Sequence, residues 1–136
     1  MKTDETDERI IEKLKADSRA SNVEIARSLG MTEGAVRWRI KRMADSGLIS
    51  RFTIELSSGM SNYAVLMVKA KGETKKMMAA VSELKSHRDA YEISGEYDGC
   101  VILEGPSVED IDAKIDKIRK LKEVADTRTY ISFKRW

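Results

Sequence analysis

Apolar residues recur at helical spacing in three successive stretches of the first 50 residues, with polar residues between them. A repeat of three and four residues places such side chains on one face of an α-helix. The pattern therefore predicts three amphipathic helices that pack their apolar faces together. These faces hold Ile10, Ile11 and Leu14, then Ile25, Ala26 and Leu29, then Val36, Ile40 and Met43.

Helix-capping residues stand at the boundaries between these segments. Ser21, with Glu24 three residues later, has the spacing of a capping box at the start of the second helix. Gly30 can end that helix because glycine takes a positive φ without strain, and Thr32 can cap the third helix. Two helices joined by such a short turn are typical of a helix-turn-helix.

From residue 48 onward the apolar period changes. Residues 48–56 alternate between apolar and polar, which indicates a strand or an extended connector. The rest of the chain favours the order strand, helix, strand, strand, helix, strand, which is that of the ferredoxin-like βαββαβ unit. We expect strands around 63–70, 91–93, 100–103 and 129–133, and helices around 77–84 and 108–121.

The predicted fold class is α+β, with an N-terminal three-helix (winged) helix-turn-helix domain followed by a ferredoxin-like βαββαβ domain. Small polar residues gather at 57–62, where no apolar period crosses, and they mark a boundary. We expect a helix-turn-helix DNA-binding domain at 1–50, a connecting strand and linker at 51–61, and a ferredoxin-like effector-binding and oligomerisation domain at 62–136.

One face of the predicted sheet has no helix to cover it. The apolar run at 63–70 places apolar side chains on both faces of its strand, so the uncovered face must be buried elsewhere. A second copy of the chain is the natural cover, and we therefore expect a homodimer. Its two-fold symmetry would present two recognition helices to a pseudo-palindromic DNA site.

The charges are nearly balanced overall, with 25 basic and 23 acidic side chains, but they are distributed unevenly. Residues 37–51 hold five basic side chains and a single acid, Asp45. A local basic patch of this kind indicates contact with double-stranded DNA. The five basic residues are Arg37, Arg39, Lys41, Arg42 and Arg51.

The chain offers few residues for other chemistry. Its one cysteine cannot form an intramolecular disulfide, and with one histidine it is poorly suited to a zinc site. Because no phosphate loop, nucleophile elbow or catalytic triad is present, we expect no enzyme activity, no cofactor and no metal. No membrane span or signal peptide is visible, so we expect no membrane partner and a cytoplasmic protein.

The third helix is the candidate DNA reader. Arg37 and Lys41 fall on its outer side and are the candidates for base contacts, since arginine can donate two hydrogen bonds to guanine. Arg39 and Arg42 are better placed for phosphate. Trp38 either contacts the DNA or packs back against the first helix. The full set of DNA-binding candidates is Ser21, Asn22, Thr32, Glu33, Gly34, Arg37, Trp38, Arg39, Lys41 and Arg42.

The turn at 94–99 is a candidate ligand site. Two glycines allow close backbone approach, Asp98 could hold an ammonium group, and free N–H groups could hold a carboxylate, which together suit an amino acid. Hydroxyls of Thr127 and Thr129 on the last strand would add polar contacts. The alternative is an ordinary hairpin turn in which Asp98 bonds its own backbone.

Several runs, in their order and spacing, resemble the Lrp/AsnC family, the feast/famine regulators of bacteria and archaea. The runs are Asp4–Ile11, Asp17–Ala26, Thr32–Met43 with Gly47–Ile49, Gly95–Asp98 and Val124–Tyr130. Residues 49–54 look like those of archaeal members, among them members that govern lysine synthesis. The chain departs from the family in its short linker, which lacks the usual proline.

The resemblance implies more than the residues alone. Family members form dimers, assemble further to tetramers or octamers, and in many cases bind an amino acid at the contact between dimers. Carried over by position, Asp98 would bind the ammonium group of such an effector. The effector-binding candidates are Ser94, Gly95, Tyr97, Asp98, Thr127, Thr129 and Ile131.

The sequence thus predicts a sequence-specific DNA-binding transcriptional regulator that responds to a small molecule such as an amino acid. Two alternatives stay open. One is an architectural DNA-binding protein without an effector, and the other is a metabolite-binding ferredoxin-like module.

Overall fold

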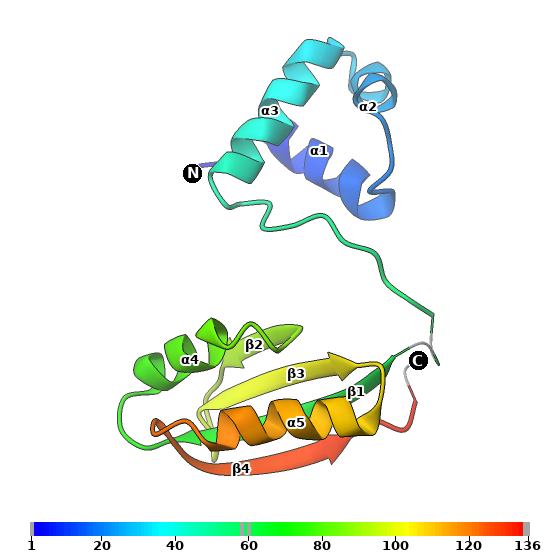
Figure 1. The fold of residues 1–136 in the computed structure, drawn as a ribbon. Helices are drawn as coiled ribbons and strands as arrows, with labels where there is room; N and C mark the ends of the chain where they lie inside the picture. Colours follow the sequence, from blue (N-terminus) through cyan, green and yellow to red (C-terminus); the bar gives the residue numbers. More distant parts are fainter. Residues whose placement is uncertain (1, 58, 60, 135–136) are drawn as a thin grey trace. The chain divides into compact units, whose positions relative to one another are not determined.

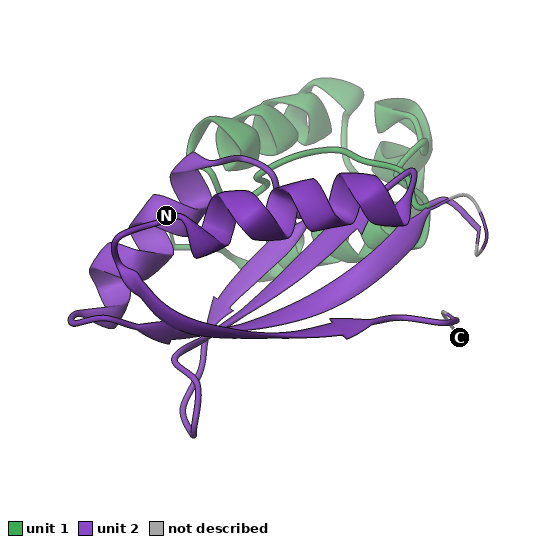
Figure 2. Cartoon of the chain, turned by 60° about the horizontal axis from the view of Figure 1, so that its bottom comes forward, with its two compact units in different colours: residues 1–55 green, residues 56–136 purple. Residues whose placement is uncertain are grey.

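A computed structural model describes residues 2–57, 59 and 61–134, and the chain divides into two compact units, residues 1–55 and residues 56–136 (Figure 2). We call these the N-terminal and C-terminal units. The first holds the helices α1 (Glu5–Ala16), α2 (Asn22–Leu29) and α3 (Glu33–Asp45). The second holds a four-stranded antiparallel sheet and two helices, so the predicted α+β class is confirmed (Figure 1).

The two helices of the predicted helix-turn-helix begin and end as their capping residues predict. The Ser21 hydroxyl accepts the Glu24 N–H at 3.2 Å, and the Glu24 carboxylate accepts the Ser21 N–H at 2.7 Å. This second bond favours the charged form and lowers the pKa of Glu24. Gly30 takes a φ of +67°, and Thr32 then caps α3 by accepting the Ala35 N–H. These local features fix where α2 begins and ends and where α3 begins.

The three helices bury one small apolar core, made of Ile10, Ile25, Ala26, Val36 and Met43. After α3 the chain runs extended from residue 51 to residue 57 without forming a strand. Of the two alternatives that the alternating pattern left open, the structure has the connector, and the described residues of this unit contain no wing strand. A strand needs a neighbour for its N–H and C=O groups, and apart from this segment the described part of the unit holds only helices and the turns between them.

The C-terminal unit has the strand order β2-β3-β1-β4, all antiparallel. Met77 and Val81 of α4 pack against one face of the sheet, together with three isoleucines of α5. Both helices therefore cover the same face, as the βαββαβ order predicts. The elements are β1 (Asn62–Ala70), α4 (Thr74–Glu83), β2 (Asp89–Glu92), β3 (Gly99–Gly105), α5 (Val108–Arg119) and β4 (Val124–Ile131).

The other face of the sheet stays uncovered in the single chain. Along β1 the burial alternates, with Ala64, Leu66 and Val68 fully buried and Val65 and Met67 only half-buried. The continuous apolar run therefore reflects one helix-covered face and one bare apolar face. Half-buried side chains of β3 extend the bare face at the register of Val65 and Met67, namely Cys100 and Ile102, and Tyr91 and Tyr130 flank them.

Close packing at the start of β3 generates a test of this fold. A Cβ added to Gly99 would lie 2.7 Å from Val68 Cγ2 and 2.7 Å from Met78 Sδ. We predict that Gly99→Ala lowers the free energy of unfolding by about 1–3 kcal/mol, because overpacking forces the neighbours to shift. Urea denaturation followed by circular dichroism measures the change, and an unaltered midpoint would contradict the packing of α4 on β3.

Candidate nucleic-acid interface and effector turn

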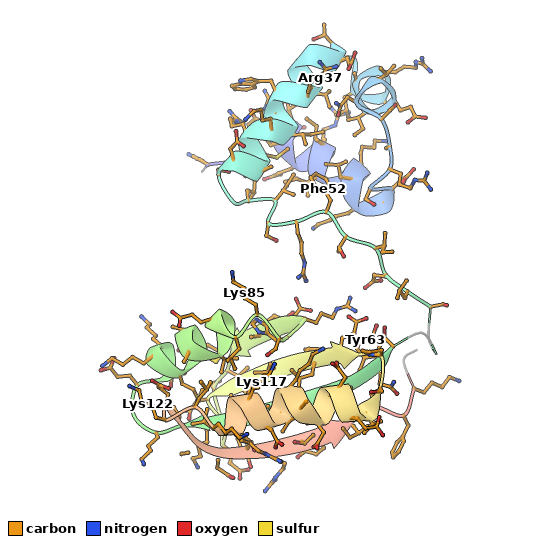
Figure 3. All side chains as sticks on the ribbon, in the orientation of Figure 1. Arg37, Phe52, Tyr63, Lys85, Lys117 and Lys122 are labelled. Atoms are coloured by element: carbon orange, nitrogen blue, oxygen red, sulfur yellow. The ribbon has the colours of Figure 1, made fainter. Side chains whose placement is uncertain are left out.

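The outer face of α3 is exposed and holds the residues expected to read DNA. Gly34, Arg37, Trp38 and Lys41 follow one another at helical spacing, and all four are exposed. Val36 and Met43 on the opposite side are fully buried against the other helices. Because its inner face is anchored in this way, α3 presents the four outer positions as one surface. Figure 3 shows Arg37 on this helix.

The structure excludes one of the two interpretations of Trp38. Its side chain is 58% exposed, so it does not pack back against α1 as a buried residue would. Instead the Arg42 guanidinium lies 4.7 Å from the centre of its ring, a distance typical of a cation–π contact. The indole thus lies flanked by a cation on the exposed side of the helix.

Two of the outer cations pair with acids of their own helix. Arg37 pairs with Glu33, and the Lys41 ammonium lies 2.5 Å from the Asp45 carboxylate, each pair being four residues apart. The cationic side chains are 65% and 73% exposed. Exposed pairs of this type contribute about 0.2–0.5 kcal/mol. A phosphate or a base edge can therefore replace the carboxylate at little cost.

Arg39 and Arg42 are placed differently from what the sequence suggested. Arg39 Nη1 lies 2.7 Å from a carboxylate oxygen of Asp4 and 2.7 Å from one of Asp7, and Arg42 Nη2 lies 2.6 Å from the second oxygen of Asp7. Asp7 is fully buried. The two arginines that we expected to contact phosphate thus bind α3 to α1 in this structure. The guanidinium of Arg39 also lowers the pKa of Asp4.

The polar candidates at the turn serve as helix caps. Ser21 and Thr32 are the N-caps of α2 and α3, and Asn22 is the first residue of α2. Ser21 and Thr32 are exposed, and Asn22 and Glu33 are half-buried. These residues therefore surround two helix N-termini, where backbone N–H groups and the helix dipole favour an anion.

The turn at 94–99 is bonded to the end of β1. Asp98 Oδ2 accepts the Ala70 N–H at 2.8 Å, and the Asp98 N–H donates to the Val68 carbonyl at 3.0 Å. The side chain of Asp98 thus bonds to a neighbouring strand and not to its own turn, while its carbonyl accepts the Ile93 N–H at 3.0 Å. Tyr97 is buried, with the Arg128 guanidinium 5.6 Å from its ring centre.

Of the effector-binding candidates on β4, Thr127 lies level with the turn at 94–99 and Ile131 does not. Thr127 pairs with Val68 of β1, the residue whose carbonyl binds the turn, so it lies across β1 from Asp98. Ile131 pairs with Ala64, four residues further along, and lies away from the turn. The Thr127 hydroxyl accepts from Arg119 Nε at 3.1 Å. The buried Thr129 hydroxyl has no hydrogen-bond partner among the described residues.

The described ranges 2–57, 59 and 61–134 hold no group of three or more His, Cys, Asp or Glu side chains arranged to bind a metal ion. Nor does any helix within them have the length and apolar character needed to cross a membrane.

Two family descriptions match the chain, one for each unit. Residues 3–50 match winged helix-turn-helix DNA-binding, and residues 63–136 match the Lrp/AsnC ligand binding domain. The chain is similar to the HTH-type transcriptional regulator LysM of Saccharolobus solfataricus. The two are 33% identical over 135 residues, which cover 98% of this chain and 95% of LysM.

Solved structures show the same fold at lower identity. A feast or famine regulatory protein from M. tuberculosis, complexed with L-methionine, has a TM-score of 0.74 and 20% identity over 96% of this chain and 91% of its own. A transcriptional regulator of Neisseria meningitidis in complex with L-Met has a TM-score of 0.70 and 18% identity, covering 97% and 90% of the two chains.

Gly34 generates a test that separates stability from DNA binding. It is helical and exposed, and a Cβ there would meet nothing within 4 Å. We predict that Gly34→Ala raises the free energy of unfolding by up to about 1 kcal/mol, since alanine is the better helix former. The same change should weaken DNA binding, because the methyl group would hold the start of α3 away from the duplex. Urea denaturation and fluorescence anisotropy measure the two effects, and unweakened binding would remove Gly34 from the interface.

Proposed function

This chain belongs to the Lrp/AsnC family of DNA-binding transcriptional regulators, and we propose that it reads DNA through Gly34, Arg37, Trp38 and Lys41 of α3. The observation that carries this proposal is the exposed outer face of α3. Its cations Arg37 and Lys41 form weak surface ion pairs, so DNA can replace the carboxylate in each pair. Arg37 and Lys41 would contact bases, and Trp38 would pack on a sugar or a thymine methyl group.

Phosphate contacts would come from the N-termini of α2 and α3. We assign them to the residues around the caps, namely Ser21, Asn22 and Thr32, because backbone N–H groups there attract anions. Glu33 would orient Arg37 by pairing with it. Arg39 and Arg42 are left out of this set because their guanidinium groups bind Asp4 and Asp7.

The bare face of the sheet supports self-association. Val65, Met67, Cys100 and Ile102 form its half-buried apolar centre, and a second sheet packed face to face would bury them. We propose a homodimer of this kind, with further assembly to a tetramer or an octamer. The dimer would present two copies of α3 to the two halves of one DNA site.

The effector is proposed to be an amino acid bound beside β1. The two solved relatives described above are complexed with L-methionine. In this chain Asp98 Oδ2 accepts the Ala70 N–H, which leaves Oδ1 to accept from an ammonium group. Thr127 and the unpartnered hydroxyl of Thr129 lie across β1, and Ser94, Gly95 and Tyr97 complete the turn. A regulator of this kind needs no enzyme activity. It would act in the cytoplasm, where both DNA and free amino acids are present.

Arg37 tests the reading of bases. We predict that Arg37→Ala lowers the affinity for a duplex selected by the wild-type protein about tenfold or more, because a bidentate arginine contact discriminates by about 1–3 kcal/mol. Its affinity for a random duplex should fall less. Anisotropy titrations at one salt concentration measure both values, and equal losses on the two duplexes would show that Arg37 contacts only the backbone.

Asp98 tests the effector site. Asp98→Asn keeps an oxygen that can accept the Ala70 N–H but removes the negative charge. We therefore predict an intact fold, unchanged DNA binding and loss of the response to amino acids. A thermal-shift screen of the twenty amino acids, run on both proteins, measures this response because a ligand of the folded state raises the melting temperature. An equal shift in both proteins would exclude Asp98 as the ammonium ligand.

A further inference from the structure

Asp7 of α1 binds two arginines of α3 through one buried carboxylate. Oδ1 lies 2.7 Å from Arg39 Nη1, and Oδ2 lies 2.6 Å from Arg42 Nη2. The Asp7 side chain is 0% exposed, whereas Arg39 and Arg42 are 21% and 35% exposed. Both arginines thus turn their guanidinium groups inward toward α1, although they belong to the helix that faces DNA.

The contacts of Arg42 continue to the reading face itself. Its guanidinium lies 4.7 Å from the centre of the Trp38 ring, and its Nε is buried without a hydrogen-bond partner in the described part of the chain. The bond from Nη2 to Asp7 is therefore what holds this stacked guanidinium in place. Through it, Asp7 fixes the surface on which the exposed indole rests.

We propose that Asp7 sets the DNA specificity of this protein by withholding Arg39 and Arg42 from phosphate and by holding Trp38 in position. This inference rests on the proposed reading of DNA by α3. Phosphate contacts add affinity that is independent of sequence, so two further free cations on α3 would strengthen binding to every duplex alike. Asp7 is accordingly a positioning residue.

The cations of α3 form two kinds of ion pair, one with carboxylates that reach solvent and one with the buried Asp7. This difference explains why only Arg37 and Lys41 would be released to bound DNA. The side chains of Glu33 and Asp45 are 43% and 63% exposed, so their carboxylates can lose a cation to DNA and be solvated by water. Asp7 is fully buried and cannot be solvated in this way, so a phosphate that removed an arginine would leave a buried charge unpaired. Arg37 and Lys41 are therefore available to DNA, whereas Arg39 and Arg42 stay with α1.

The test compares the full-length wild-type protein with Asp7→Asn on two duplexes, one selected by the wild type from a random pool and one random. Affinities are measured by anisotropy between 50 and 200 mM KCl. We expect Asp7→Asn to bind the random duplex several-fold more tightly at low salt. The slope of log affinity against log salt should steepen by about 0.9 for each guanidinium that reaches a phosphate. The ratio of selected to random affinity should fall about tenfold, the effect of one misplaced base contact.

Two controls show whether the effect of Asp7→Asn depends on Arg39 and Arg42. Glu8→Gln removes the same charge from the next position of α1, where the side chain is exposed and has no ion pair within residues 2–57, and it should leave the slope unchanged. Adding Asp7→Asn to an Arg39→Gln, Arg42→Gln protein should not tighten binding to the random duplex. If Asp7→Asn does not fold, Arg39→Gln in the wild-type background is the second variant. It should leave the slope unchanged, because Arg39 reaches no phosphate while Asp4 and Asp7 hold it, and a slope shallower by about 0.9 would overturn the inference.

Weaker binding of Asp7→Asn to both duplexes, or an unaltered slope, would overturn this inference and leave Asp7 as a residue that only stabilises the fold. A wild-type protein that shows no preference for its selected duplex would instead overturn the proposed reading of bases by α3. The two failures are thus distinguished by the wild-type measurement alone.

Discussion

The N-terminal unit depends on the burial of one charged group, the carboxylate of Asp7. A buried carboxylate is unfavourable unless its oxygens are paired, and here Arg39 and Arg42 of α3 each bind one of them. Removing one partner of such a buried pair costs about 3–5 kcal/mol, so orientations of α3 that break it are penalised. The apolar contacts of Val36 and Met43 supply the packing between helices, and the ion pairs select one arrangement of it.

This constraint divides the basic patch of α3 into two groups with different roles. Arg37 and Lys41 have partners on their own helix, and the carboxylates of those partners reach solvent, so DNA competes with weak surface pairs. Arg39 and Arg42 neutralise acids of α1 and contribute to the shape of the reading surface, with Trp38 resting on Arg42. A helix that looks uniformly basic in sequence therefore exposes only part of its positive charge.

The C-terminal unit follows a simpler rule, the two-residue period of a strand. Ala64, Leu66 and Val68 of β1 are buried beneath α4 and α5, and the alternate residues form the bare face. Val68 also lies between the turn that holds Asp98 and the strand that holds Thr127. The same strand thus positions the core, the proposed dimer surface and the proposed effector site, so a change in its register would disturb all three.

Local patterns in the sequence determined the elements and their order. The helix faces, the capping box of Ser21 and Glu24, the positive φ of Gly30 and the βαββαβ order depend on residues that are close together in the chain, and the structure contains them all. Only the tertiary structure decided the partners of long side chains. The bonds from Arg39 and Arg42 to Asp7 join residues 32 and 35 positions apart, and that of Asp98 to β1 spans 28. Spacing along a chain cannot predict such contacts, because they form only where packing brings distant segments within hydrogen-bond reach.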